Sequence, residues 1–242
     1  MPNFTGNKIY QPWTEFSETA KHGIGELAVT SDGRAFRYVK VGAVALVVGN
    51  ALQARIEDTD HDNVAVRATD AGSFELLITT GSGSGALDAN EYAGGFAVID
   101  TTPGLGYIYK IDHHAAIAAS TDGILYLDKA DPIQVALTTS SKVTLVRSPY
   151  NGVIQFPVTT ATNICVGGAI APITALYHGW IQTAGPGAGL IAGTPGAGLP
   201  VTAIGAVAGA LTVHSGELGT VAKMMCTGRD GKVLPVQWMC EG

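Results

Sequence analysis

The chain has 242 residues, enough for one large β domain or two smaller ones with their own cores. Charged residues make up only 14% of it, glycine occurs 32 times, and the formal net charge is −6. This composition excludes a disordered chain and a largely helical one, and the negative charge gives nucleic acid no electrostatic reason to bind.

The first 22 residues differ from the rest because their apolar residues follow no period of 2 or 3.6. They contain no basic cluster followed by an apolar run, so they do not form a secretory signal. Aromatic side chains bury a large apolar area when they dock. We therefore predict an extended arm that covers either its own domain or a neighbouring subunit, with these candidate interface residues: Phe4, Tyr10, Trp13 and Phe16.

A β-hairpin is predicted next, in "ELAVTSDGRAFRYVKVG". Asp32-Gly33 is a dipeptide that favours a two-residue type I′ turn, because both of its residues need positive φ. Pairing outward from this turn sets Val29 opposite Phe36, so that the large apolar side chains share one face.

The rest of the chain consists of short apolar runs separated by turn residues, a spacing typical of sandwiches and barrels. We predict an all-β fold, sandwich-like or barrel-like, with an extended N-terminal arm and little helix. The predicted domains are an arm at 1–22, a β domain at 23–155 and a second β subdomain at 156–242, low in charge and rich in Gly and Ala. The predicted strands include "ALVVGNALQARI", "VAVRA", "SFELLITT", "GGFAVID", "GYIYKIDHHAAI", "GILYL", "PIQVAL", "KVTLV", "GVIQF", "NICVGGAI", "YHGWIQT", "LPVTAI", "TVAKMM" and "VLPVQW".

An uncharged block runs from Ser148 to Gly216, without a single Asp, Glu, Lys or Arg. Prolines cut it into pieces shorter than the ~20 residues that a membrane-spanning helix needs, so we expect a soluble protein with no membrane partner. Exposed strands with little charge tend to associate with other chains. This is a liability for a protein unless the association is part of its function. The block therefore favours a self-assembling or lattice-docked protein over a β domain with plain Thr/Ala/Gly-rich faces.

The stretch "EDTDHDN" suggests a calcium loop, because Asp58, Asp60 and Asp62 alternate as the first ligands of an EF-hand do. However, the twelfth position is Thr69 instead of glutamate, and the flanks are predicted strands instead of helices. We interpret the stretch as a solvated loop whose aspartates form turn hydrogen bonds. The sequence leaves open whether calcium ever binds there.

A second motif, "GSGSGA", resembles a dinucleotide fingerprint at Gly81, Gly83 and Ala86, with Asp100 after the next strand. The residues before Gly94-Gly95 are too few for a crossover helix, so we predict a surface loop and no cofactor.

No catalytic or metal-binding constellation is evident in the sequence. His113 and His114 are neighbours on a predicted strand and point to opposite faces, and no zinc-type histidine spacing or G-x-S-x-G elbow occurs. We therefore predict that the protein is not an enzyme, with no catalytic, cofactor-binding or metal-binding residues.

The three cysteines, Cys165, Cys226 and Cys240, form no C-x-x-C pair. With Asp230-Gly231 as a hairpin loop, Cys226 faces Pro235 and Cys240 faces Val221, so these two thiols do not meet. We expect reduced, buried thiols in a protein assembled inside a cell.

Several stretches resemble a family of tailed-bacteriophage virion structural proteins, of the head decoration or cement type. They are "DGRAFRYVKVGAVALVVGNALQA", "NEYAGGFAVI", "GYIYKI", "DPIQVALTTSSKVTLVRSPYNGV" and "ITALYHGWIQTAGP", and they span about residues 30–190. Asp131–Val153 and Tyr177–Pro186 are the most specific. The N-terminal arm and the last fifty residues match only loosely.

The resemblance implies a β-rich homotrimer on the outside of an icosahedral head, which cements neighbouring capsomers after expansion. The implied partners are the major capsid protein and copies of the chain itself. The implied location is the capsid exterior of the virion, after assembly in the host cytoplasm. The resemblance transfers no catalytic residue, and it implies no metal role for Glu57–Asn63 and no cofactor role for "GSGSG".

The alternative is a receptor- or glycan-binding module on the phage head or tail. A sugar site needs an exposed aromatic platform with polar groups beside it. Trp180 with Gln182 and His178 could form one, although strand alternation favours a core position for Trp180.

Overall fold

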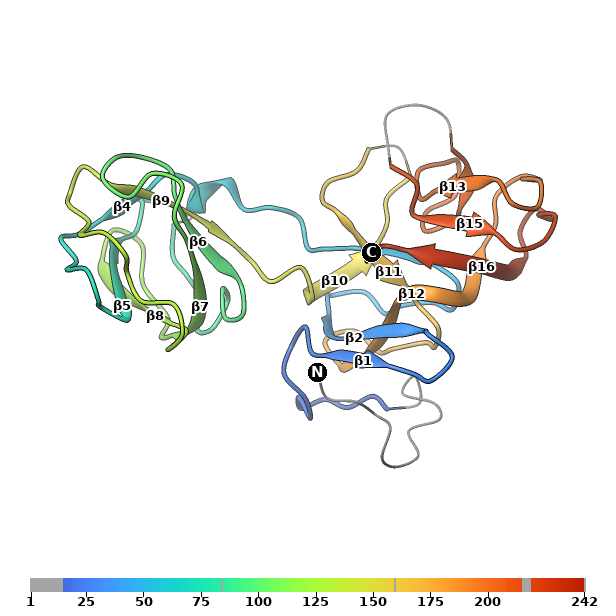
Figure 1. Ribbon diagram of the computed structural model, residues 1–242, viewed down its shortest axis with the longest axis horizontal. Helices are drawn as coiled ribbons and strands as arrows, with labels where there is room; N and C mark the ends of the chain where they lie inside the picture. Colours follow the sequence, from blue (N-terminus) through green and yellow to red (C-terminus); the bar gives the residue numbers. More distant parts are fainter. Residues whose placement is uncertain (1–14, 84, 159, 215–218, 242) are drawn as a thin grey trace. The chain divides into compact units, whose positions relative to one another are not determined.

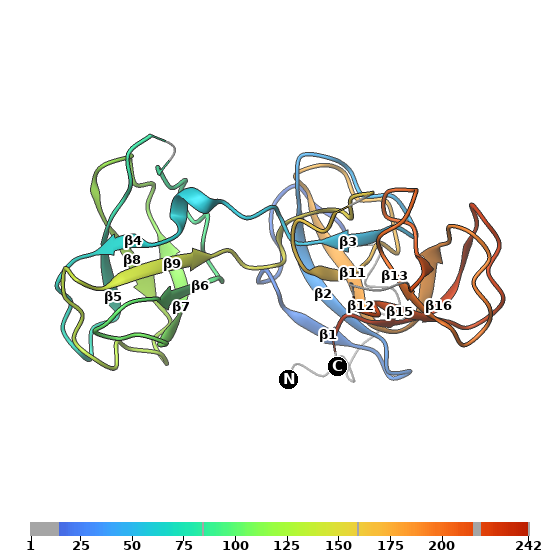
Figure 2. The same cartoon turned by 90° about the horizontal axis from the view of Figure 1, so that it is seen from above.

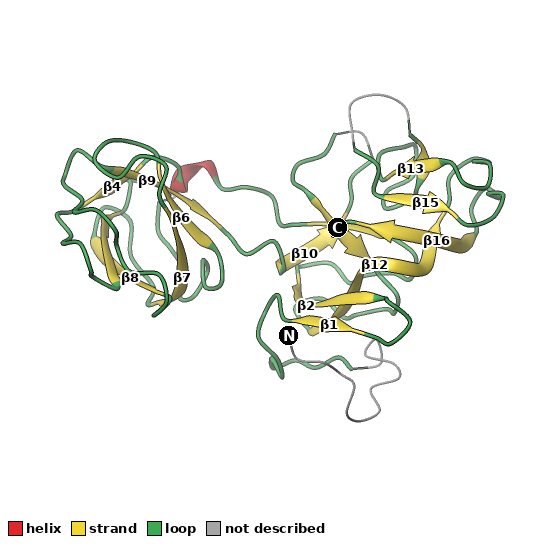
Figure 3. Ribbon diagram, viewed as in Figure 1, coloured by secondary structure: helices red, strands yellow, loops and turns green. Residues whose placement is uncertain are grey.

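The computed structural model describes residues 15–83, 85–158, 160–214 and 219–241. Within these residues the chain forms sixteen strands and one short 3₁₀ turn, η2 (Thr59–His61). Figure 3 shows the turn as the only helical piece drawn among strands and loops. The predicted all-β fold with little helix is confirmed.

The chain folds into two compact units, and the second is inserted into the sequence of the first. Unit 1 comprises Met1–Ile56 and Pro149–Gly242, and unit 2 comprises Glu57–Ser148. The predicted division into 23–155 and 156–242 differs from this one, because residues 23–56 belong with the C-terminal part of the chain. The loss of charge after Ser148 marks the return to unit 1, whereas no comparable change in composition marks the exit near Ile56.

Unit 2 is a closed antiparallel barrel (Figures 1 and 2). Its strands pair in the order β4-β5-β8-β7-β6-β9, so each has a neighbour on both sides. Alternate side chains point inward and form one apolar core that includes Leu76, Ile99, Tyr109 and Leu125. The strands are β4 (Val64–Val66), β5 (Glu75–Thr79), β6 (Phe96–Ile99), β7 (Ile108–His114), β8 (Asp122–Leu127) and β9 (Lys142–Val146).

One predicted strand of this unit, "PIQVAL", is not a regular strand. It forms one isolated bridge, between Leu137 and Thr69 of the loop after β4. Ile133 and Leu137 are nevertheless buried in the barrel core. The apolar pattern here belongs to a loop that covers the core, and such a loop cannot be told from a strand by pattern alone.

Unit 1 is built on a ten-stranded sheet in the order β1-β2-β10-β3-β11-β12-β16-β15-β13-β14 (Figure 1). β2 also pairs with β12, so the strands from β2 through β10, β3 and β11 to β12 close into a ring. The strands are β1 (Leu27–Val29), β2 (Ala35–Val41), β3 (Ala51–Gln53), β10 (Asn151–Gln155), β11 (Cys165–Gly168), β12 (His178–Leu190), β13 (Pro200–Thr202), β14 (Thr212–Val213), β15 (Ala222–Met224) and β16 (Val233–Met239).

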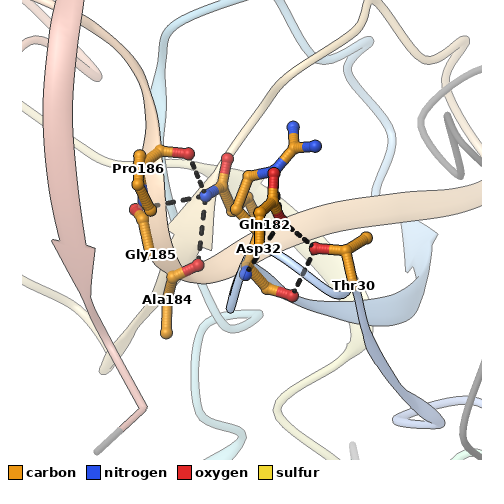
Figure 4. Close-up of polar contacts among 7 residues, drawn as sticks. Thr30, Asp32, Gln182, Ala184, Gly185 and Pro186 are labelled. Atoms are coloured by element: carbon orange, nitrogen blue, oxygen red, sulfur yellow. Dashed lines mark hydrogen bonds and ion pairs between the residues drawn. The ribbon is translucent and has the colours of Figure 1, made fainter.

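The long strand β12 joins two parts of this sheet. Its first half pairs with β2 and its second half with β16, and its register against β2 shifts after Gln182. The buried Gln182 amide nitrogen lies 3.0, 3.2 and 2.8 Å from the carbonyl oxygens of Ala184, Gly185 and Pro186 (Figure 4). Gly185 has a φ of +90°, and a Cβ there would lie 2.9 Å from Arg34 Cα. Gln182 thus stabilises the register shift in β12, and only glycine fits at position 185.

The β1–β2 hairpin forms, but the predicted register is wrong by one residue. Ala28 pairs with Phe36, and Val29 pairs with Ala35. The Thr30 N–H donates to the Arg34 carbonyl at 2.9 Å, so the loop is three residues long and ends at Gly33, with a φ of +83°. Asp32 holds this loop by accepting hydrogen bonds from Thr30 Oγ1 at 2.5 Å and from Arg34 Nε at 2.9 Å (Figure 4).

Candidate interaction surfaces

The N-terminal arm, from Glu15 onward, docks on the outer side of β2 and β12 in its own unit. Ser17 forms an antiparallel bridge with His178, with backbone hydrogen bonds of 3.0 and 2.8 Å. The Trp180 indole donates to the Glu15 carboxylate at 3.3 Å, and the Lys21 backbone N–H donates to the Tyr38 hydroxyl at 3.1 Å. This part of the arm covers its own domain, which was one of the two predicted alternatives.

His22 completes these contacts. We call Tyr38, His178 and Trp180, which the arm residues contact, the arm seat. Its ring lies 5.0 Å from that of Tyr38 and 5.1 Å from that of Trp180, and its Nε2 is 3.0 Å from the Glu15 carboxylate. Burial opposes ionisation of Glu15, but hydrogen bonds from Trp180 and His22 outweigh it and hold the pKa of Glu15 below its ordinary value. The arm is therefore held by a charged hydrogen-bonded carboxylate as well as by ring packing.

The four aromatic residues predicted as an interface divide into two groups. Phe4, Tyr10 and Trp13 lie outside the described residues. Phe16 lies next to the docked Ser17, with 49% of its surface exposed. The side chains that hold the docked segment, Tyr38 and Trp180, carry no signal in the sequence that distinguishes them from other core aromatics.

The proposed sugar platform at Trp180 does not form. Trp180 is 1% exposed, and Gln182 and His178 are buried as well. Gln182 is engaged with the backbone of β12, and His178 Nδ1 is 3.1 Å from the carbonyl oxygen of Glu18. The arm covers the ring that a sugar would have to stack on, so the core position favoured by strand alternation is correct.

The aspartate-rich loop lies at the start of unit 2. Asp58 caps the turn η2 by accepting from the Asp60 backbone N–H at 3.3 Å, as a turn-forming aspartate does. Its carboxylate also binds Arg147 at 3.0 Å. Burial opposes ionisation of Asp58, but the hydrogen bonds from Arg147 and the Asp60 N–H, together with the nearby positive charge, outweigh it and lower the pKa of this carboxyl. The guanidinium therefore takes the place next to Asp58 that a cation would need.

Arg147 is the centre of a half-buried polar cluster in unit 2. It binds Asp58 and Glu91 together, and its guanidinium lies 5.1 Å from the Tyr92 ring centroid. The Tyr92 hydroxyl is 2.5 Å from His61 Nδ1. These contacts tie the first turn of the unit to its last strand, which is a structural role.

The two neighbouring histidines of β7 point to opposite faces, as predicted. His113 is exposed and stacks on Tyr126, with ring centroids 4.5 Å apart. His114 is buried, and its Nε2 accepts from the Tyr92 backbone N–H at 3.0 Å. In the described part of the chain, no three or more His, Cys, Asp or Glu side chains gather as metal ligands would.

The "GSGSG" stretch follows β5 as a loop instead of opening a helix. Gly81, Ser82 and Gly83 are exposed, and the described residues between them and β6 form loop and turns with one bridge, between Leu87 and Ile117. The dinucleotide interpretation needs a helix whose N-terminus faces the phosphates, and this segment provides none.

The outer face of the unit 2 barrel carries an apolar surface across three strands. Phe96 of β6 lies opposite Val146 of β9, and Val98 of β6 lies opposite Ile108 of β7. Phe96, Val146 and Ile108 are 39%, 45% and 56% exposed. We call these four residues the barrel apolar face. Side chains opposite one another on paired strands are in contact range, and Phe96 and Val98 join the two pairs along β6; Lys110 of β7 and Thr144 of β9 border the patch.

Unit 1 has a comparable surface in the loop between β2 and β3. Val44 is 65% exposed, and Val47 and Val48 are exposed as well. The nearby Leu176 is also exposed, and its backbone N–H donates to the Gly42 carbonyl at 3.0 Å. Loops that face water usually carry polar residues, so this run of valines marks a second candidate contact surface.

Comparison with known proteins identifies no relative of this chain. The chain matches no family model, no curated protein and no solved structure. No helix in the described ranges is long and apolar enough to cross a membrane.

Proposed function

We propose that the protein is a structural virion protein, which binds the outer surface of a phage capsid and cements neighbouring capsomers. The observation that carries this proposal is the barrel apolar face. A closed barrel has no free strand edge to pair with another chain, so it can associate only through its outer surface or its ends. Exposed apolar patches of this kind mark interaction sites.

The resemblance to head decoration proteins points to the same role. Its most specific stretches, Asp131–Val153 and Tyr177–Pro186, include β9, the start of β10 and the first nine residues of β12. Val146 of the barrel apolar face lies in the first of them. The resemblance is therefore strongest in segments that carry a candidate contact residue and the arm seat.

Two compact units in one chain suit the bridging of neighbours. A chain that contacts one capsomer with each unit makes their separation break both contacts. Many copies around a shell make individually weak contacts cumulative. In this proposal the copies associate as homotrimers, which analytical ultracentrifugation of the purified chain tests independently.

The barrel apolar face can be tested with a matched pair of variants. Phe96→Ser removes the central ring of the face. Phe74→Ser removes a phenylalanine of similar exposure (43%) before β5, which lies on the other side of the six-stranded ring. We expect Phe96→Ser, combined with Ile108→Thr, to weaken binding to expanded phage heads at least tenfold, and Phe74→Ser to leave it unchanged. Equal binding by both variants would refute the assignment of this face.

A further inference from the structure

Two of the three cysteines meet in unit 1 although 75 residues separate them in sequence. Cys165 begins β11, and Cys240 follows the end of β16. Their Sγ atoms are 3.5 Å apart, and both thiols are free. Cys226, also free, is the third cysteine. The sequence excludes a meeting of Cys226 and Cys240 but gives no sign of the contact with Cys165.

The backbone holds both cysteines firmly in place. Cys165 pairs with Gln53 of β3, and the Cys240 N–H donates to the Thr183 carbonyl of β12 at 3.0 Å. The next residue, Glu241, accepts hydrogen bonds from Arg37 at 2.7 Å and from Thr183 Oγ1 at 2.8 Å. The approach of the two sulfurs is therefore set by the pairing of Cys165 with β3 and by the hydrogen bond of Cys240 to β12.

We infer that Cys165 and Cys240 form a site of reversible oxidation to an intramolecular disulfide, with a peroxide as the oxidant. The sulfurs need to approach by about 1.5 Å to reach the disulfide bond length of about 2.05 Å. Rotation of the two short side chains about their Cα–Cβ bonds can provide this. Both residues have intermediate exposure and their side chains pack against the apolar core of unit 1, so the oxidant has to be as small as hydrogen peroxide.

The environments of the two sulfurs assign them different roles. A hydrogen bond from Cys240 and contacts with backbone N–H groups outweigh burial and lower the pKa of the Cys165 thiol. The interaction with Cys165, together with burial, raises the pKa of Cys240. The Cys240 Sγ also lies 3.7 Å from the Val221 carbonyl oxygen, an acceptor that favours the protonated thiol. The thiolate is the reactive form of cysteine, so we assign the attack on the oxidant to Cys165.

The reaction balances in two steps. The Cys165 thiolate attacks one peroxide oxygen and breaks the O–O bond, and the leaving hydroxide takes a proton to become water, which leaves a sulfenic acid. Cys240 then attacks the Cys165 sulfur, and its thiol proton leaves with the sulfenic hydroxyl as a second water. Two thiols lose two electrons to one peroxide. This inference does not depend on the proposed function.

The disulfide would tie β11 to the C-terminal end of the chain. A cross-link that closes a loop of 75 residues restricts the unfolded chain strongly. We expect the melting temperature of unit 1 to rise by about 5–10 °C on oxidation and to return on reduction.

The test uses the full-length chain, reduced and then treated with a small excess of hydrogen peroxide. We expect the mass to fall by 2 Da, the thiols alkylated after denaturation to fall from three to one, and a peptide containing Cys165 to be linked to one containing Cys240. Cys226→Ser is the matched control and should still form the bond, whereas Cys165→Ser should not.

Two results would overturn the inference. One is that all three thiols remain available for alkylation, or become sulfinic acids, under conditions that oxidise an exposed model dithiol. The other is that the linked peptides contain Cys226 or come from two different chains. Both are read from the wild-type protein, so neither depends on whether a cysteine variant folds.

Discussion

The indole nitrogen of Trp180 donates a hydrogen bond to the carboxylate of Glu15 at 3.3 Å, although the two residues are 165 positions apart in sequence. This contact joins the N-terminal arm to the beginning of β12. Residues 15–22 are therefore part of the fold of unit 1. In the proposed function, a strap to the shell or to a neighbouring subunit has to come from the residues before them.

Glu15 should contribute measurably to the stability of unit 1. Glu15→Ala removes the acceptor for Trp180 and the partner of His22, and we expect it to lower the free energy of unfolding by about 1–2 kcal/mol. Glu15→Gln keeps an oxygen that can accept from Trp180, so its effect should be about half as large. All three tryptophans lie in unit 1, so urea unfolding followed by tryptophan fluorescence reports on this unit. Identical midpoints for wild type and Glu15→Ala would contradict the role of the seat.

Two truncations separate the seat of the arm from the proposed strap. Deletion of residues 1–14 removes Phe4, Tyr10 and Trp13 and leaves every described seat contact in place. We expect this deletion to abolish binding to phage heads without lowering the melting temperature of unit 1. Deletion of residues 1–22 should abolish binding and also destabilise the unit, because it uncovers Tyr38 and Trp180. Undiminished binding by the shorter deletion would refute the strap.

Unit 2 should fold when it is excised as residues 57–148. Its barrel closes on itself and has its own core, and its two ends leave the barrel next to each other in the Asp58–Arg147 contact. We expect dispersed amide signals in an NMR spectrum and one cooperative thermal transition followed by circular dichroism. A spectrum typical of an unfolded chain would show that the barrel needs unit 1.

Arg147 should matter more than an exposed arginine of the same unit. Arg147→Ala leaves Asp58 and Glu91 as half-buried carboxylates without their shared cation, and we expect a loss of about 3 kcal/mol. Arg67→Ala breaks the exposed pair with Asp122 and should cost about 0.5 kcal/mol. Chemical unfolding of the excised unit, followed by circular dichroism, measures both. Equal losses would mean that the cluster is not buried as described.

Unit 2 should lose stability in mild acid because of His114. Burial is the main cause that lowers the pKa of His114 below its ordinary value of 6.5, so the unfolded chain binds a proton more readily than the folded one. Stability is therefore lost as the pH falls from about 6.5 toward the folded pKa. His114→Gln should flatten this pH dependence of the unfolding midpoint, and the exposed neighbour variant His113→Gln should keep it. The same slope in both variants would exclude His114 as its source.

The sequence predicts the class of the fold better than its connections. Alternation locates most of the strands and places Trp180 in the core, because period 2 is a local property, but it also marks the core-covering loop "PIQVAL" as a strand. The hairpin register depends on whether the loop around Asp32-Gly33 has two or three residues. Both loops suit these residue types, and a slip of one residue exchanges the faces of the strand. The burial of Ala28 instead of Val29 cannot be read from the sequence alone.

The long-range relationships are the part that the sequence does not reveal. The exit of the chain into unit 2 near Ile56 has no mark in composition, and only pairing between β3 and strands after residue 150 shows that this segment belongs with the C-terminal part. The Cys165–Cys240 contact and the barrel apolar face depend in the same way on which strands lie side by side.

Quantitative mass spectrometry of gradient-purified phage particles from the source, scaled to the major capsid protein, tests the central claim most directly. Our proposal predicts a copy number comparable to that of the shell subunit. A handful of copies per particle would move the protein to the tail or a fibre. Its absence from the particles would contradict the proposal that it is a virion protein.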